Sequence, residues 1–330
     1  PAGYFNVYRE IINQHKSKSI DVVLHLGDYI YEYGSGEYAT ENATALGREP
    51  SKGTECVTLE DYRARYAQYR QDSDLQELHA TLPMIAVWDD HELANDAWKE
   101  GAENHQDSEG SFYDRRAAAA AAWVEWLPVR ENPISNMLIY RQFAFGDLVN
   151  LMMLDTRLVG RDKPLDYFSM SPPSMEGIAQ LVAESRASDR ELLGMDQLGW
   201  LVEQFTTNNS KWNVLGQQVL MSKMEIPSSV MLAMFQLFTA TDEQKSAALL
   251  AVNSAMTAYL ADPSSDPVTL PYNLDAWDGY YVEREKLYQL AQSVSGNFVC
   301  LAGDTHNAWT SELADMSGNP IGVEFATSSV

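Results

Sequence analysis

The chain has 330 residues, a mass of 37.0 kDa and a formal net charge of −24 at pH 7, from 23 basic and 47 acidic side chains. Such an anionic surface repels phosphate backbones and anionic lipid headgroups, which argues against a nucleic-acid-binding module. No run of about 18 or more uncharged apolar residues is present, so no transmembrane helix is expected. The two cysteines, Cys56 and Cys300, are too few for a disulfide scaffold.

Helical and strand patterns alternate along the chain. A helical face is predicted over 5–15, and further helices are predicted over 113–126, 175–205, 241–260 and 282–291. Five short apolar runs are predicted to be buried strands: 21–26, 83–88, 148–154, 212–216 and 298–302. The segment 34–58 is expected to be a long loop. The alternation predicts a layered α/β protein without internal repeats.

All five predicted strands lead directly into polar residues that are capable of chemistry. The segments that follow them are Gly27-Asp28, Asp89-Asp90-His91-Glu92, Asp155-Thr156-Arg157, Gln217-Gln218 and Gly303-Asp304-Thr305-His306. In α/β sheets, ligands gather beyond the ends of the strands. We therefore expect the active site where these strand ends meet.

Asp28 follows a buried strand and a glycine, so its carboxylate projects with little bulk beside it. This arrangement suits a ligand that bridges two metal ions. Tyr31 lies three residues further on, near enough to bind the same ion as a phenolate, which needs a strong Lewis acid because the free phenol has a pKa of about 10. An aromatic cluster with Tyr29 and Tyr33 at the strand end explains Tyr31 equally well.

Two other strand ends combine carboxylates with a histidine. An isolated Asp-Asp-His-Glu run is more often a solvated turn, but its place after a hydrophobic strand favours a site at 89–92. Asp90 is a candidate metal ligand, and His91 is a candidate for protonating a leaving group or holding a phosphoryl oxygen. Asp304 and His306 lie two residues apart after the last predicted strand, so both can meet one metal centre.

Arg157 places a guanidinium at a strand end of an acidic chain, where it can bind phosphoryl oxygens in a bidentate manner. The alternative for Arg157 is a salt bridge to Asp155 or another carboxylate. Asp278 precedes the helix predicted at 282–291 and is a further candidate ligand, although a capped helix start also explains it.

The chain lacks a P-loop, a dinucleotide-binding glycine motif, a serine-hydrolase elbow and a Cys-x-x-Cys pair. The usual support for a P-loop nucleotide-binding protein, a nicotinamide-dependent enzyme, a serine hydrolase or a zinc ribbon is therefore missing.

Six motifs follow one another along nearly the whole chain. They are HLGDYIYEYG (25–34), VWDDHELAND (87–96), LDTR (154–157), LGQQVL (215–220), WDGY (277–280) and AGDTHNAW (302–309). Together they resemble the alkaline phosphatase D (PhoD-like) branch of the calcineurin-like metallophosphoesterases. The resemblance implies a four-layer α/β/β/α sandwich of two mixed β-sheets flanked by helices. It also implies one metallophosphoesterase domain over 1–330, lacking the first strand with its ligand motif and an upstream β-sandwich domain.

The resemblance also implies a centre of two metal ions. Asp28 takes the position of the bridging carboxylate, and Tyr31 matches a tyrosine that binds Fe³⁺ in this branch. The positions of the other ligands correspond to Asp90, Asp304 and His306. Oxygen ligands at two of these positions favour a harder ion, so Fe³⁺ with Ca²⁺ is implied, with other divalent metals as alternatives. Gln217 stands nearest to a ligand histidine of the superfamily.

The implied activity is hydrolysis of phosphate monoesters or diesters by in-line attack of metal-bound hydroxide, of the alkaline phosphatase D type. His91 and Arg157 are then expected to stabilise the transition state or the leaving group, beside the bridging Asp28. Small-molecule phosphate esters are the implied substrates, and the implied location is secreted or periplasmic. The alternatives are a catalytically incomplete homologue that binds metal or phosphate, and a phosphodiesterase of phospholipase type.

Overall fold

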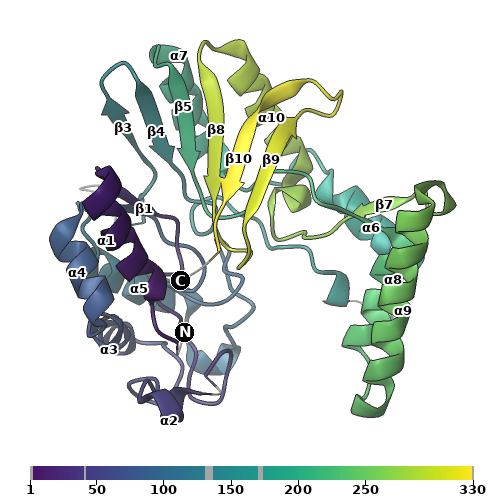
Figure 1. Cartoon of the computed structure of the whole chain (residues 1–330), viewed down its shortest axis with the longest axis horizontal. Helices are drawn as coiled ribbons and strands as arrows, with labels where there is room; N and C mark the ends of the chain where they lie inside the picture. The colour runs from purple at the N-terminus through teal and green to yellow at the C-terminus, as the bar shows by residue number, and fades with distance from the viewer. Residues whose placement is uncertain (1–2, 41, 131–136, 170–173, 329–330) are drawn as a thin grey trace.

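A computed structural model describes residues 3–40, 42–130, 137–169 and 174–328 (Figure 1). The strands are β1 (Val23–His25), β2 (Met84–Ala86), β3 (Arg141–Phe145), β4 (Val149–Met153), β5 (Trp212–Gly216), β6 (Glu225–Pro227), β7 (Thr269–Pro271), β8 (Asn297–Ala302), β9 (Trp309–Ala314) and β10 (Pro320–Ala326). The α-helices are α1 (Asn6–Lys18), α2 (Ala43–Leu46), α3 (Leu59–Tyr69), α4 (Ser73–Thr81), α5 (Phe112–Trp126), α6 (Met175–Ser185), α7 (Gly194–Thr207), α8 (Ser228–Phe238), α9 (Asp242–Ala261) and α10 (Tyr281–Ser293).

Six strands form a mixed sheet in the order β3-β4-β5-β8-β10-β9. The four central strands are parallel, and the edge strands β3 and β9 run antiparallel to their neighbours. In register, Val214 of β5 lies between Leu151 of β4 and Val299 of β8. Parallel strands deliver their carboxyl ends to one edge of the sheet, which is where the polar segments after β4, β5 and β8 begin.

Alternate residues of the central strands face two different cores. Leu151 and Met153 of β4 pack with the parallel β1–β2 sheet and with α1, α3, α4 and α5. Met152 and Leu154 face the opposite side and pack with α7 and α10. This period of two produces four layers, namely helices, the β1–β2 sheet, the six-stranded sheet and helices (Figure 1). The predicted α/β sandwich is confirmed.

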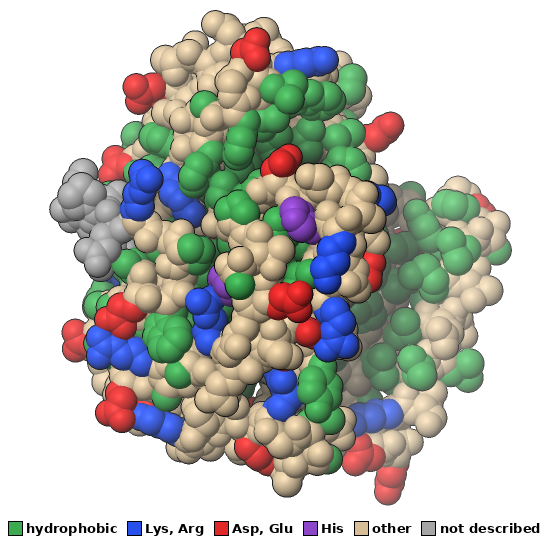
Figure 2. Space-filling model, turned by 60° about the vertical axis from the view of Figure 1, so that its left-hand side comes forward, with side chains coloured by type: hydrophobic (Ala, Val, Ile, Leu, Met, Phe, Trp, Pro, Cys, Tyr) green, Lys and Arg blue, Asp and Glu red, His purple; other side chains and the backbone are tan. Residues whose placement is uncertain are grey.

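The β6–β7 ribbon and the hairpin of α8 and α9 form an arm that projects from the side of the sandwich (Figure 1). A third core holds the arm to α6 and contains Tyr167, Ile178, Ile226, Val230, Phe235 and Leu270. None of the residues of α9 is buried, and Leu249, Leu250 and Leu260 are exposed. Figure 2 shows the resulting hydrophobic side chains on the arm, behind the sandwich at the right.

The five predicted strands are confirmed as β1, β2, β4, β5 and β8. The helix predicted over 175–205 is instead two helices, because carboxylates capture backbone N–H groups between them. Asp162 accepts from the Glu191 N–H at 2.9 Å, and Glu283 accepts from the Leu193 N–H at 3.0 Å. The predicted loop over 34–58 contains the short helix α2 in its described part. No helix in the described ranges is long and apolar enough to cross a membrane.

Candidate metal centre

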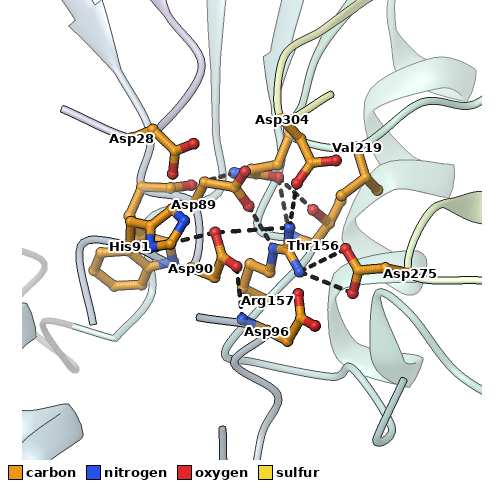
Figure 3. Close-up of polar contacts among 12 residues, drawn as sticks. Asp28, Asp89, Asp90, His91, Asp96, Thr156, Arg157, Val219, Asp275 and Asp304 are labelled. Atoms are coloured by element: carbon orange, nitrogen blue, oxygen red, sulfur yellow. Dashed lines mark hydrogen bonds and ion pairs between the residues drawn. The ribbon is translucent and has the colours of Figure 1, made fainter. Parts of the chain in front are cut away.

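The chain segments after β1, β2 and β8 converge on one polar cluster (Figure 3). Asp28 follows β1, Asp89 to His91 follow β2, and Asp304 follows β8. Two groups of these side chains each bring ligand atoms within 4.8 Å of one another. The first group is Asp28, Asp90 and His91, and the second is Asp89, Asp90 and Asp304. Asp90 belongs to both groups, so the cluster offers two adjacent cation sites.

Asp28 has a buried carboxylate oxygen that no described residue contacts through a hydrogen bond. The atom is Oδ1, whereas Oδ2 accepts a hydrogen bond from the Tyr31 hydroxyl at 3.1 Å. An unpaired buried carboxylate oxygen is costly unless a cation binds it. A set of carboxylates with one or two imidazoles suits hard and borderline cations. The residues present therefore fit a metal centre.

The carboxylates of the cluster repel one another. Burial raises the pKa of Asp304 to about 7, and the nearby Asp275 and Asp90 add to this rise. Burial likewise raises the pKa of Asp96, whose N–H donates to Asp90, to about 8. Such crowding disfavours the charged forms of Asp304 and Asp96, and a bound cation would relieve it. Asp90 differs, because the charges of Arg157 and His91 outweigh the effect of burial and lower its pKa to about 2.

The backbone at the site adopts left-handed conformations. The φ angle is +58° at Asp28, +66° at Asp304 and +55° at His306, a region that Asp, Asn and His enter more readily than most other residues. Gly27 has a φ of +119°, and a Cβ there would lie 2.6 Å from the backbone nitrogen of Asp89. Only glycine therefore allows the ends of β1 and β2 to approach this closely.

Tyr31 joins Asp28 and His306, as a shared ligand would. Besides its bond to Asp28, the Tyr31 hydroxyl lies 2.9 Å from Nε2 of His306, and its ring stacks on His91 with centroids 4.1 Å apart. Tyr38, from the loop predicted over 34–58, stacks on Tyr31 and places its hydroxyl 3.2 Å from Nδ1 of His306. The aromatic cluster and the polar site therefore coincide.

Glu32 orients His91, and we did not identify it from the sequence. Its buried Oε2 lies 2.8 Å from Nδ1 of His91, and its Oε1 accepts from the Asn95 N–H at 2.8 Å. Burial opposes charge on His91, but the carboxylates of Asp90, Asp28 and Glu32 raise its pKa well above the usual value. The only signal in the sequence was a carboxylate between two tyrosines. With Nδ1 held, Nε2 of His91 is left for the cluster.

Arg157 is fully buried and points into the cluster (Figure 3). Its Nε donates to Asp89, and its Nη2 donates to Asp304 at 2.8 Å. Its Nη1 donates to Asp275 at 2.9 Å. The guanidinium thus forms salt bridges, which were the alternative for this residue. It does not bond to Asp155, which Arg157 contacts through its backbone N–H, at 2.9 Å. Nη2 also lies 3.8 Å from Asp90, so a phosphoryl oxygen would compete with these carboxylates for Arg157.

Gln217 and Asp278 lie outside the cluster. Gln217 accepts from Nε1 of Trp277 at 3.1 Å and donates to the carbonyl of Val219. Asp278 accepts from Nη1 of Arg284 at 2.6 Å. Both side chains are buried and bonded on the side of the sheet that α10 covers, so the structure does not bring them to the candidate ligands.

Glu92 ties two strand ends together. Its carboxylate accepts from the backbone N–H groups of Asp28 at 3.0 Å, Tyr29 at 2.5 Å and Asp89 at 2.7 Å. One buried side chain thus fixes the backbone after β1 relative to the backbone after β2. Its place beside His91 in the sequence marked Glu92 as part of the site without revealing this role.

Comparisons with known proteins identify the family of this chain. The family model described as "PhoD-like phosphatase" matches residues 1–330. Alkaline phosphatase D of Bacillus subtilis (strain 168) is 33% identical over 336 residues, which cover 99% of this chain and 48% of that protein. A solved structure titled "Structure of PhoD" has a TM-score of 0.71 and 31% identity, and the match covers 99% of this chain and 54% of that one. The chain thus spans about half the length of these relatives. It belongs to the PhoD-like phosphatase family.

Proposed function

We propose that this chain hydrolyses small-molecule phosphate esters at a centre of two metal ions. The observation that carries the proposal is the buried Oδ1 of Asp28, which has no hydrogen-bond partner among the described residues. Asp28 belongs to one of the two candidate metal groups, and the two groups share Asp90. Membership of the PhoD-like phosphatase family and the similarity to an alkaline phosphatase D support the reaction class. Ester hydrolysis needs both charge neutralisation at phosphorus and an activated water, and this donor set suits ions that supply both.

The residues that would hold the ions are Asp28, Tyr31, Asp90, Asp304 and His306. Bound metal ions would lower the pKa of a water molecule and neutralise charge on the phosphoryl group. His91, which Glu32 holds through Nδ1, presents Nε2 for a hydrogen bond to a phosphoryl oxygen or to the leaving group. Arg157 balances the carboxylates around it and keeps Asp89 and Asp304 in place.

We propose Fe³⁺ and Ca²⁺ as the metals. Burial and the neighbouring Asp28 raise the pKa of the Tyr31 phenol, so only a strong Lewis acid such as Fe³⁺ would bind it as a phenolate. Asp90 and Asp304 contribute hard oxygen ligands of the kind that Ca²⁺ prefers.

The family resemblance also supports export from the cytoplasm, which fractionation of the native host would test.

Elemental analysis of protein purified without added metal tests the centre, together with the visible spectrum and hydrolysis of 4-nitrophenyl phosphate. We expect iron, calcium, turnover and a tyrosinate-to-iron charge-transfer band that Tyr31→Phe abolishes. Tyr4→Phe, an exposed tyrosine far from the cluster in the sequence, is the matched control and keeps the band. Zinc or manganese without the band contradicts the proposed metals. A fully metallated protein without turnover contradicts the proposed reaction.

A further inference from the structure

A cavity of about 740 Å³ lies between the sandwich and the arm. Its lining includes Met224, Met256, Tyr259, Tyr272, Asn307 and Trp309. These side chains come from the residue before β6, from α9, from the segment after β7, and from β9 with the loop before it. The volume falls within the range of small-molecule sites, roughly 300–1,000 Å³.

The loop after β8 is shared between the cavity and the metal centre. Asp304 belongs to one candidate metal group, and His306 bonds to Tyr31 within the same cluster. Thr305 and Asn307, which alternate with them, line the cavity. Alternate residues of this loop thus serve the two sites, so the cavity adjoins the centre.

The segment after β7 is shared in the same way. Tyr272 and Asn273 line the cavity. Two residues further on, Asp275 accepts from Nη1 of Arg157 at 2.9 Å inside the cluster. The loop after β8 and the segment after β7 therefore each contribute residues to both the cavity and the metal centre. A group attached to a phosphate at the centre would have to pass only one of these segments to reach the cavity.

The aromatic side chains of the cavity are available to stack on a ligand. Tyr259, Tyr272 and Trp309 have no aromatic partner within the described ranges, and Tyr272 and Trp309 are 45% and 38% exposed. Flat unpaired faces of this kind bind planar rings by offset stacking. Met224 and Met256 add flexible apolar walls that adapt to a ligand's outline.

Among the described residues that line the cavity, no free cation is available to a second phosphate. Its one lysine, Lys223, directs its ammonium group to the carbonyl of Asp315 at 3.2 Å and to Glu285 at 3.8 Å. Its one carboxylate, Glu225, accepts from the Thr269 hydroxyl at 2.9 Å. A polyphosphate would therefore be poorly stabilised there, whereas an uncharged ring would be well accommodated.

We propose that this cavity binds the alcohol part of the ester and selects a planar aromatic group that carries no second phosphate. The inference rests on the proposed function, because it assigns a leaving-group site to that reaction. It makes Trp309 and Tyr272 specificity-determining residues and gives the arm a role, since α9 supplies Met256 and Tyr259 to the outer wall.

The test compares 4-methylumbelliferyl phosphate with glycerol phosphate. The measured ratio is kcat/KM for the aromatic ester divided by kcat/KM for glycerol phosphate. In Trp309→Ala and in Tyr272→Ala we expect this ratio to fall about tenfold, mainly because KM for the aromatic ester rises. Trp309→Phe should restore most of the ratio, because a ring remains. Leu250→Ala, on the exposed part of α9 outside the cavity, is the control and keeps the wild-type ratio. Equal losses for both esters, or no loss, would overturn the proposal.

Equilibrium dialysis of free 4-methylumbelliferone separates this proposal from the hydrolase proposal. We expect the wild type to bind the fluorophore about tenfold more tightly than Trp309→Ala does. If the wild type hydrolyses neither ester, the hydrolase proposal fails, and dialysis by itself decides whether the cavity binds a planar ring. Equal binding by the wild type and both alanine variants refutes the cavity's role.

Discussion

Asp28 differs from an ordinary buried carboxylate in three respects. Its backbone is left-handed, its Oδ1 has no hydrogen-bond partner among the described residues, and its N–H donates to Glu92 at 3.0 Å. A strained backbone and an unpaired oxygen both cost free energy, and both persist where the surrounding structure holds them for a function. We therefore regard Asp28 as the residue on which the centre depends most.

Asp28→Asn should reduce kcat for 4-nitrophenyl phosphate by more than about 100-fold, because the amide lacks the charge that holds the metals. The fold should persist, since Asn also adopts positive φ readily. Steady-state kinetics, elemental analysis and near-UV circular dichroism check the three expectations. Asp147→Asn, in the exposed turn between β3 and β4, is the control and stays fully active. If Asp28→Asn kept more than a small fraction of the wild-type activity, the bridging role would be refuted.

Glu32→Gln should lower kcat/KM by about 10- to 100-fold, because the imidazole of His91 loses the carboxylate that orients it. Metal content should stay at the wild-type level, since Glu32 belongs to neither candidate metal group. Kinetics and elemental analysis on the same samples separate the two effects. Glu243→Gln, exposed in the first turn of α9, provides the control. Loss of metal in Glu32→Gln would show that Glu32 supports metal binding, either directly or through His91, which belongs to the first candidate metal group.

Helix α3 connects helix stability with the site. Its capping box pairs Thr58 with Asp61, and its inner face buries Tyr62 and Arg65 in or beside the first core. Arg65 donates to the backbone carbonyl of Tyr31, so the position of α3 also sets the position of a candidate ligand. At the start of helix α9, the Gln244 side chain accepts from the Thr241 N–H at 3.1 Å, but α9 has no buried residue and therefore contributes much less to the core.

Thr58→Ala should lower the free energy of unfolding by about 1 kcal/mol, because an N-terminal N–H of α3 loses its acceptor. Thr241→Ala, at the corresponding N-cap position of α9, should lower it by less, since the exposed helix frays without opening the core. Urea denaturation followed by tryptophan fluorescence measures both values. Equal changes in the two variants would mean that α9 unfolds together with the sandwich.

The first core also contains two histidines that burial keeps neutral. His25 of β1 and His79 of α4 both lie against the ring of Tyr29, whose hydroxyl is 2.8 Å from Nε2 of His79. Burial lowers the pKa of each imidazole to about 4, and for His79 the charge of Arg70 contributes. In the unfolded chain both imidazoles would titrate near 6.5. Acid therefore favours the unfolded chain through these two groups.

Stability should reflect this difference between pH 6.5 and pH 4. Because the folded-state pKa of His79 is the lower one, the unfolded chain binds the proton first, and stability is lost as pH falls through this window. His79→Gln cannot take up a proton, so the wild type should lose stability relative to the variant on acidification. Chemical denaturation of both proteins at pH 7, 5.5 and 4 measures the change. A difference in stability that is independent of pH would show that the pKa of His79 is the same in the folded and the unfolded chain.

Much of the fold could be predicted from the sequence because its signals are local. Continuous apolar runs identified five strands, and the polar residues after them included Asp28, Asp90 and Asp304, which do meet. The short β6 and β7, the edge strands β3 and β9 and the central strand β10 were not predicted. The paired strands β6 and β7 are separated along the chain by α8 and α9, and β3 and β9 have mostly exposed or half-buried residues instead of a continuous buried apolar run. Helix α8 was also missed, because its apolar run has no clear polar face.

The sequence by itself determined the layered α/β class, the strand ends that carry the chemistry and the family, because each is written in contiguous residues. Only the tertiary structure decided where neighbouring side chains point. Gln217 and Gln218 follow the same strand, yet Gln217 faces Trp277, while Gln218 bonds to the carbonyl of Trp88 beside the cluster at 2.7 Å. The partners of Arg157 likewise come from three distant segments. Side-chain direction and long-range pairing depend on the packed layers, and no local pattern encodes them.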